Sequence, residues 1–194
     1  MEKPNNYDET QVIGDFEFLE PGGYICKIKN AKEETSSTGK AMLVVAFDIA
    51  EGEHEGIYQR RFEEISKNDI KAKWPNNGVH RIMLENSEGN TNKFFKTFIT
   101  SVEQSNNFTF WKNNKGDVKN LKDKLFGGIF GEEEYEKMNG EIGTTTKLVW
   151  IRTTATIEDG KYTIPEPKKL IRNNSNDSND IFNQAITSDD DLPF

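Results

Sequence analysis

The chain has 194 residues, a formal net charge of −8 and 34% hydrophobic residues. This length fits one domain with an appendage. No apolar run approaches the roughly 18 residues that a membrane span needs, and the first residues lack an apolar signal region. Cys26 is the only cysteine, which excludes an intrachain disulfide and suits a reducing compartment. The sequence therefore predicts a cytoplasmic protein without a membrane segment.

The negative charge is concentrated near the C-terminus. Residues 173–194 contain five aspartates and no lysine or arginine, so they carry −5 and residues 1–172 carry −3. A nucleic-acid-binding protein usually has a basic surface. Such a function would therefore require a local basic groove on this mildly acidic body.

The first predicted elements are two strands. Residues 1–20 form a polar lead-in, from which Phe16, Phe18 and Leu19 would lie over the domain. A turn at the Pro-Gly-Gly sequence then precedes a half-buried strand over 24–32, where apolar and polar residues alternate. Residues 41–50 are almost continuously apolar, which predicts a central strand. The residues that would share its buried face are Leu43, Val45, Phe47 and Ile49.

A third strand and a helix are expected next. Residues 57–63 alternate between apolar and polar side chains, which predicts a strand. In residues 92–103, apolar side chains fall at i, i+3, i+4 and i+7, the spacing of an amphipathic helix. These side chains are Phe95, Phe98, Ile99 and Val102. Asp117 is placed to cap a short helical turn over 117–122.

Two long strands complete the predicted domain. Residues 125–135 contain three glycines, which suit a coiled or bulged strand. Asn139–Gly140 is a turn signal, residues 144–157 predict another strand, and residues 161–164 would pair back weakly. The order of three strands, a helical insert and two strands is that of an OB fold, a five-stranded Greek-key barrel with its helix between strands 3 and 4. Order alone leaves other small barrels open.

The tail is the most specific signal in the sequence. We expect the domain to cover residues 21–170 and residues 171–194 to be a disordered acidic tail, because 173–183 are too polar to fold. The tail ends in Asp189, Asp190, Asp191, Leu192, Pro193 and Phe194. A terminal phenylalanine presents a ring and a carboxylate together, which a partner pocket with an apolar slot and a basic rim would capture. A merely solubilising end is the alternative, but solubility does not require Leu-Pro-Phe.

Enzyme signatures are weak. Residues 38–41 lack the first glycine and the hydroxyl of a phosphate-binding loop, and one Cys with two distant His residues cannot form a zinc site. A nucleophilic pair of Cys26 and His80 is conceivable, although core packing of the cysteine is favoured. The acidic runs 51–55 and 132–134 are more simply solvated turns than metal ligands. We therefore expect no catalytic residue, no metal and no cofactor.

Cations and aromatic residues occur together at several places, as in grooves that bind single strands. Core packing is the alternative for the aromatic residues, above all for Trp150 in the middle of a predicted strand. The candidate DNA-binding residues are Lys27, Lys29, Lys40, Tyr58, Arg60, Arg61, Lys73, Trp74, Phe108, Phe110, Trp111, Lys112, Trp150 and Arg152. Arg152 shares a strand face with Trp150, so the two would form a stacking pair.

Several segments resemble a known family. The ending Asp189–Phe194 is similar to the acidic C-terminal tip of bacterial single-stranded DNA-binding proteins. The body instead resembles single-stranded DNA-binding proteins of phages and prophages. The matching segments span most of residues 20–170 and are Pro21–Tyr24, Gly39–Glu53, Leu125–Tyr135 and Gly160–Glu166. The resemblance implies an OB fold, sequence-independent strand binding in phage replication or recombination inside the host cell, and a tip that docks on replication or recombination proteins.

The sequence therefore predicts a non-enzymatic protein that coats single-stranded DNA and recruits partners through its tip. Its acidic tail would compete with DNA for the groove. The alternatives are a replisome or recombinase adaptor that binds protein instead of DNA, which the acidic body favours, and a metal-dependent nuclease. Edge strands would permit a homo-oligomer, and nothing in the sequence selects its size.

Overall fold

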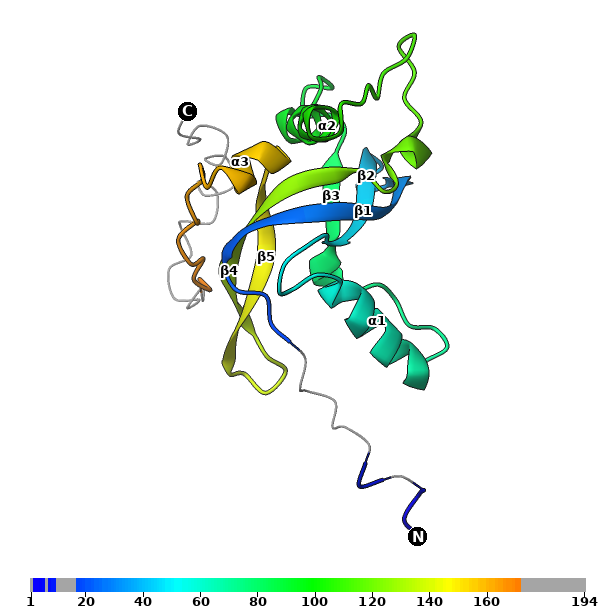
Figure 1. The fold of residues 1–194 in the computed structure, drawn as a ribbon, viewed down its shortest axis with the longest axis vertical. Coiled ribbons are helices and arrows are strands. Elements are labelled where there is room, and N and C mark those ends of the chain that lie inside the picture. The colour runs from blue at the N-terminus through cyan, green and yellow to red at the C-terminus, as the bar shows by residue number, and fades with distance from the viewer. Residues whose placement is uncertain (1, 6, 10–16, 172–194) are drawn as a thin grey trace.

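The computed structural model describes residues 2–5, 7–9 and 17–171 of the chain (Figure 1). Its centre is a five-stranded antiparallel sheet in the order β3-β2-β1-β4-β5. The strands are β1 Gly22–Thr35, β2 Ala41–Ile49, β3 Val79–Met83, β4 Leu125–Glu136 and β5 Ile142–Arg152. Within the described residues, β3 and β5 are the two edges of the sheet. The fold is therefore mainly β, as predicted, and the sheet does not close into a barrel.

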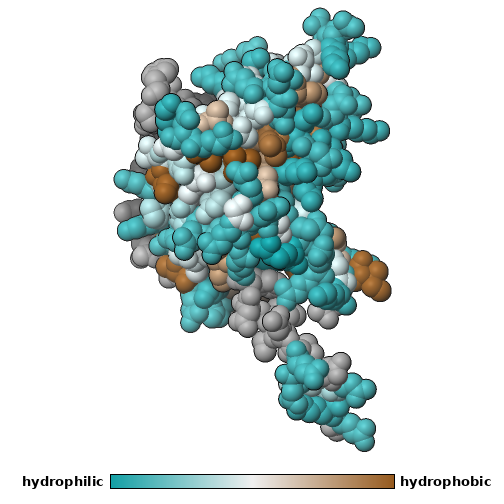
Figure 2. Space-filling view, in the orientation of Figure 1, coloured by the Kyte–Doolittle hydropathy of each residue, from teal (hydrophilic) through white to brown (hydrophobic). Residues whose placement is uncertain are grey.

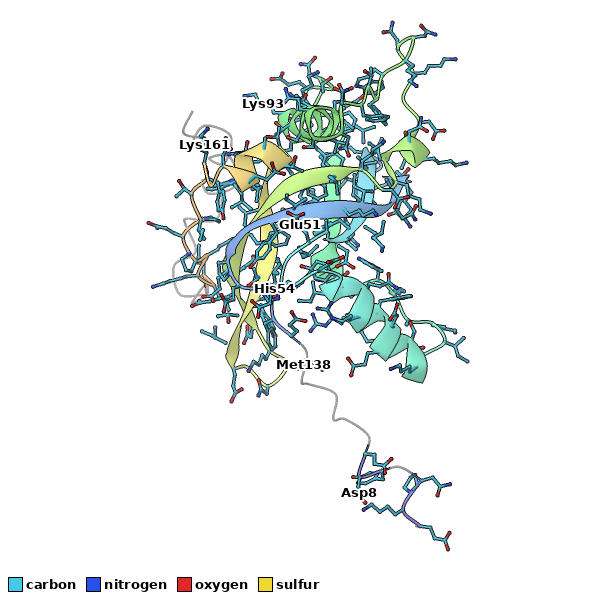
Figure 3. The ribbon with its side chains drawn as sticks, in the orientation of Figure 1. Asp8, Glu51, His54, Lys93, Met138 and Lys161 are labelled. Carbon is cyan, nitrogen blue, oxygen red and sulfur yellow. The ribbon has the colours of Figure 1, made fainter. Side chains whose placement is uncertain are left out.

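In the part of the chain that the structure describes, three helices accompany the sheet. They are α1 Ile57–Asn68, α2 Lys93–Asn106 and α3 Thr154–Glu158, with short 3₁₀ turns η1 Asn76–Gly78 and η2 Val118–Leu121. Figure 1 shows α2 across one end of the sheet and α1 projecting from the other end. The β4–β5 hairpin extends below the sheet, with the exposed Met138 near its tip (Figure 3). No helix in the described part of the chain has the length and apolar character needed to cross a bilayer.

The hydrophobic core lies between one face of the sheet and α2. All four residues predicted to share a face of β2 are buried, and Phe47 contacts Phe126 and Tyr58 edge-to-face. The helix predicted over 92–103 is confirmed as α2, whose Phe98, Ile99 and Val102 are buried in this core. Its first turn is capped by the Asn92 side chain, which accepts a hydrogen bond from the backbone N–H of Phe94 at 2.8 Å.

The predicted strand over 57–63 is wrong, because this segment is the start of helix α1. The side chains of 57–63 fit the alternation of a strand, but Ile57, Tyr58 and Ile65 also fall on one face of a helix. The Asp48 carboxylate, at the end of β2, stabilises the helix over the strand, because it accepts hydrogen bonds from the backbone N–H groups of Tyr58 and Gln59 at 2.9 Å. A side chain from a neighbouring strand thus caps the helix, and the third strand is the short β3.

The second half of the sheet follows its prediction in part. β4 is confirmed, and a bulge between Ile129 and Phe130 interrupts its pairing with β5. A Cβ on Gly127 would lie 2.5 Å from the carbonyl oxygen of Thr153, so this glycine permits close packing of the chain after β5. The short turn capped by Asp117 and the Asn139–Gly140 turn are also confirmed.

The strand predicted over 144–157 is too long. β5 ends at Arg152, because the Thr153 side chain accepts a hydrogen bond from the backbone N–H of Thr156 and starts α3. Residues 161–164 form no strand; instead, Lys168 bridges to Glu133 in β4. Of the lead-in, Leu19 is buried in the core, and Phe16 lies outside the described residues.

Candidate nucleic-acid interface

The outer face of β1, β2 and β3 carries a group of cations. We call Lys27, Lys29, Lys32 and Arg81 the outer basic face. Lys32 and Arg81 are the direct partners of Val44 across β2, so these three residues form one row on the face opposite the core. Adjacent strands are about 4.8 Å apart, which places the two cationic residues of the row roughly 10 Å apart along it.

The remaining two cations lie further along β1. Lys27 is the partner of Asp48, on the same side of the sheet as the row. Lys29 occupies the β1 bulge between Ile28 and Asn30, and its positive charge acts to lower the pKa of Asp48. Lys40 is exposed in the β1–β2 turn, at the other end of these strands.

Three carboxylates lie beside the four cations of the outer basic face. Lys32 forms an ion pair with Glu34, and the Lys27 ammonium lies 3.9 Å from Asp123. Both pairs are exposed to solvent, where such pairs contribute little. Asp48 is only 3% exposed and is occupied by the N–H groups of α1, while its burial raises its pKa above the ordinary value. The charge accessible on this face is therefore positive, although the body as a whole is acidic.

Apolar residues form no large patch on the face of the molecule that Figure 2 shows. In the view of Figure 2, hydrophilic residues predominate and apolar residues occur in small separate groups. Charge and exposed aromatic rings are therefore the features by which the candidate residues are compared below.

Trp111 is the most exposed of the candidate aromatic residues, at 44%. Its ring meets Phe110 edge-to-face at 4.8 Å and Phe95 at 6.4 Å. Phe110 is buried beneath Gly116, so it fixes the loop that presents Trp111. A hollow of about 330 Å³, which we call the Trp111 hollow, lies beside this ring. Its lining is Leu84, Glu85, Thr91, Phe95, Lys96, Ile99 and Trp111, and Leu84 directly follows β3.

The other aromatic candidates have structural roles. The Trp74 indole N–H donates to the carbonyl oxygens of Phe47 at 3.2 Å and Gly78 at 3.1 Å, which supports the packing interpretation. Phe108 is half-buried, with the ammonium of Lys124 4.8 Å from its ring centroid. The neighbouring Lys73 and Lys112 are both exposed.

The candidates of the wrongly predicted third strand lie on α1 and not on the three strands of the outer basic face. Tyr58 is 3% exposed and belongs to the core. Arg60 forms an ion pair with Glu17 at 2.6 Å and donates to the carbonyl oxygen of Glu55. Arg61 lines a separate cavity, which is described below.

Trp150 and Arg152 form the expected pair, with the guanidinium 5.9 Å from the indole centroid. The pair belongs to β5, at the opposite edge of the sheet from β3. The structure therefore brings these two residues together but does not join them to the outer basic face.

The geometry does not support the nucleophile or the metal site. Cys26 lies opposite Ile49 and His80 opposite Val45, so roughly 13 Å of strand β2 separates their rows. Burial raises the pKa of Cys26 and lowers that of His80 to about 4. In the segments that the structure describes, no group of three or more potential ligands could hold a metal ion.

Sequence reasoning missed two of the four cations. Lys32 continues the lysine pattern of the predicted first strand, which was a usable signal. Arg81 lies in β3, which was not predicted, so no pattern connected it to β1. The proposed tip, Asp189–Phe194, lies outside the described residues.

Comparison with known proteins adds one match. A family model described as "Protein of unknown function (DUF669)" matches residues 5–83, less than half of the chain. The matched segment contains β1, β2, α1 and β3, and therefore all four residues of the outer basic face. No curated protein matches the chain. The chain is thus similar, over this segment, to a family whose description assigns no activity.

Proposed function

We propose that this protein binds single-stranded DNA without sequence preference and coats it during phage DNA replication or recombination in the host cytoplasm. The outer basic face carries this proposal, because it concentrates four cations on one side of three strands in an acidic body. In addition, we propose that Asp189–Phe194 recruits replication or recombination proteins.

The arrangement of strands supports an OB-type domain. Each strand has the neighbours expected in a Greek-key barrel that is left open between β3 and β5, and α2 connects β3 to β4. At the open edge, the Asn77 amide in η1 donates to the Thr145 hydroxyl in β5 at 2.9 Å. OB folds bind oligonucleotides across strands 2 and 3, with contributions from the loops between strands 1 and 2 and between strands 4 and 5. In an OB-type domain, the outer basic face and Lys40 would correspond to the part of this surface that the first three strands contribute.

Binding would combine two weak contributions. The lysine and arginine side chains neutralise phosphates and release counterions, so the affinity falls as salt rises. Trp111 offers an accessible ring, and stacking one base on such a ring contributes about 1–3 kcal/mol. Bases that are paired in a duplex are not free to stack, which gives the preference for single strands.

A protein adaptor is the second candidate, and the Trp111 hollow is the observation that favours it. An aromatic ring beside a half-apolar hollow also suits a peptide side chain. An adaptor would bind neither single-stranded nor duplex DNA.

The test is fluorescence anisotropy with a labelled poly-thymidine oligomer, with a duplex of equal length and a salt series. The double variant Lys32→Gln/Arg81→Gln should bind roughly tenfold more weakly, since each exposed charge contact contributes up to about 1 kcal/mol. The salt slope should decrease by about 0.7 for each lost contact. The matched control, Lys161→Gln/Lys168→Gln, removes two exposed lysines from the segment after β5 and should change neither quantity. Equal weakening in both variants, or no binding by the wild type, would contradict the proposal.

A further inference from the structure

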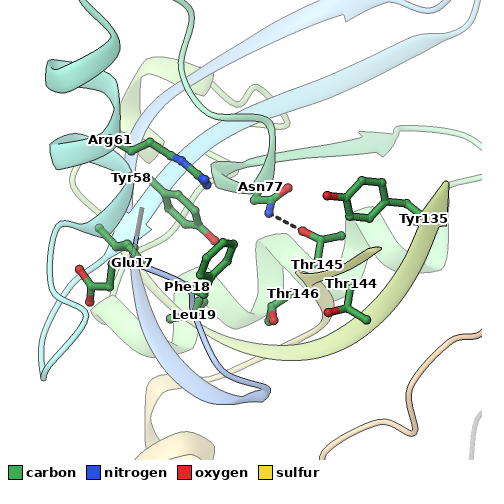
Figure 4. Close-up of a pocket in the computed structure, with 11 residues that line it drawn as sticks. Glu17, Phe18, Leu19, Tyr58, Arg61, Asn77, Tyr135, Thr144, Thr145 and Thr146 are labelled. Atoms are coloured by element: carbon green, nitrogen blue, oxygen red, sulfur yellow. Dashed lines mark hydrogen bonds between the residues drawn. The ribbon is translucent and has the colours of Figure 1, made fainter. Parts of the chain in front are cut away.

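A second cavity lies at the open edge of the sheet, where β5 faces η1 and α1 (Figure 4). We call it the seam cavity, and its volume is about 120 Å³. Four segments that are distant in sequence line it: residues 17–19, α1, η1 and the β4–β5 hairpin. None of the fourteen DNA-binding candidates except Tyr58 and Arg61 belongs to this lining. The outer basic face contributes no residue to this lining either.

The Tyr58 hydroxyl is the unusual feature of this cavity. The side chain is almost fully buried, and its oxygen has no hydrogen-bond partner among the described residues. Figure 4 shows the hydroxyl directed from α1 toward the interior of the cavity. Buried polar groups are nearly always paired, so an unpaired one calls for a missing partner. Burial also raises the pKa of Tyr58 well above its usual range, so the hydroxyl remains protonated and able to donate.

Apart from Leu19 and Ile57, the rest of the lining is polar and aromatic. The hydrogen bond between Asn77 and Thr145 fixes one wall, and the hydroxyls of Thr144 and Thr146 lie on the same strand. Phe18, in the segment 17–19, lines the cavity and is 70% exposed, so its ring is accessible for stacking. A flat ring with carbonyl and ring-nitrogen acceptors would find both hydrogen-bond donors and a stacking surface here.

The charges at the cavity argue against an anion deep inside it. The Glu17 carboxylate lies 2.6 Å from both Arg60 and His54, and these contacts hold its pKa below the ordinary value. Arg61, on α1, is the cation in the lining. An uncharged ring beside Tyr58, with its phosphate toward Arg61, therefore matches the distribution of polar and charged groups.

We propose that the seam cavity receives one unstacked nucleobase of the bound DNA strand, with the Tyr58 hydroxyl donating a hydrogen bond to it and Phe18 stacking on it. This inference rests on the proposed single-stranded DNA binding and assigns a base-recognition site to it. Asn77 of η1 lines the cavity, and η1 directly precedes β3, so a DNA strand that crosses β1, β2 and β3 would reach this edge of the sheet next.

The variant Tyr58→Phe tests the inference, because it removes only the unpaired oxygen. In the free protein this change should leave the melting temperature unchanged or raise it, since a buried hydroxyl without a partner is lost. Affinity for a poly-thymidine oligomer should nevertheless fall about five- to tenfold, the value of one hydrogen bond. The control, Tyr24→Phe, removes a hydroxyl that donates to the Glu20 carbonyl oxygen outside the cavity, and it should leave the affinity unchanged.

An abasic oligomer of the same length separates a base contact from an indirect effect. Wild type and Tyr58→Phe should bind this oligomer equally, because the base that distinguishes them is missing. Phe18→Ala should reproduce the pattern of Tyr58→Phe. If wild type and both variants bind poly-thymidine equally, the cavity holds only ordered water and the inference is overturned, while the proposed function stands. If the wild type binds no strand, the proposed function itself fails.

Discussion

Replacing Asp48 with alanine tests how a strand residue determines the helical state of α1. In the wild type, one carboxylate oxygen of Asp48 accepts from the backbone N–H groups of Ile49 and Tyr58, and the other accepts from Gln59, all at 2.9 Å. Gly56 precedes the helix with φ +71° and contributes no side-chain cap. Asp48→Ala therefore leaves the first turn of α1 without its acceptor.

The expected loss follows from these contacts. An N-cap contributes about 0.5–2 kcal/mol, and a hydrogen bond to a charged group contributes about 1.5–3 kcal/mol. Burial disfavours the charged carboxylate more than these hydrogen bonds favour it, which is why its pKa is raised, so the expected loss comes mainly from the backbone N–H groups that Asp48→Ala leaves without an acceptor. We therefore expect Asp48→Ala to lower the free energy of unfolding by about 2–4 kcal/mol at pH 7. With a urea m-value of about 2 kcal/mol per molar, the midpoint would fall by about 1–2 M.

Urea unfolding followed by circular dichroism measures this change. Asp117→Ala is the matched control, because Asp117 caps the short turn η2 with one exposed 2.9 Å hydrogen bond, and its loss should be at most about 1 kcal/mol. The raised pKa adds a pH dependence: the contribution of Asp48 is fully present below its unfolded pKa and decreases as pH rises through its folded pKa. The wild-type advantage over Asp48→Ala should therefore narrow as pH rises through that interval. A loss below about 0.5 kcal/mol at pH 7, the size of an ordinary surface change, would refute the capping argument.

Three further outcomes are expected. Trp111→Ala should lower affinity for poly-thymidine about 5- to 150-fold, the value of one base stack, and should abolish most of the tryptophan quenching, whereas Trp74→Phe should retain both. Glu17→Gln should lower stability by no more than about 1 kcal/mol at pH 7, and this difference should vanish as pH falls through the depressed pKa of Glu17, measured by urea unfolding across that range. Replacing the five aspartates of residues 173–194 with asparagine should tighten DNA binding at about 10 mM salt. The effect should be much smaller at about 150 mM salt, because the screening length falls from roughly 30 to 8 Å. Equal affinities of the wild type and this variant at low salt would exclude competition by the tail.

The sequence predicts those elements whose pattern allows one interpretation. The buried face of β2 and the apolar stripe of α2 are long and regular, so both were located correctly. Residues 57–63 fit a strand and a helix equally well, and only the Asp48 carboxylate, nine residues before α1, decides between them. Local pattern cannot reveal such a contact.

The candidate site was predicted less completely, for a related reason. Lys27 and Lys29 were identified because their strand alternates visibly. Arg81 joins them only through the pairing of β3 with β2, and β3 has just five residues. The seam cavity combines segments separated by more than a hundred residues, so no sequence window contains it.

The helical state of α1 also bears on the charge of the outer basic face. Asp48 and Lys27 are direct partners on β2 and β1, so an unoccupied Asp48 carboxylate would lie among the lysines of this face. Because the backbone N–H groups of α1 bind that carboxylate, Asp48 is buried rather than presented to solvent. The residue that stabilises the helix is thus also the carboxylate that is withdrawn from the face. If 57–63 were a strand, these N–H groups would instead pair within the sheet and Asp48 would be left to oppose Lys27 and Lys29. An acidic protein can therefore present a positively charged face on its strands when a carboxylate on that face, here Asp48, is buried as a helix cap.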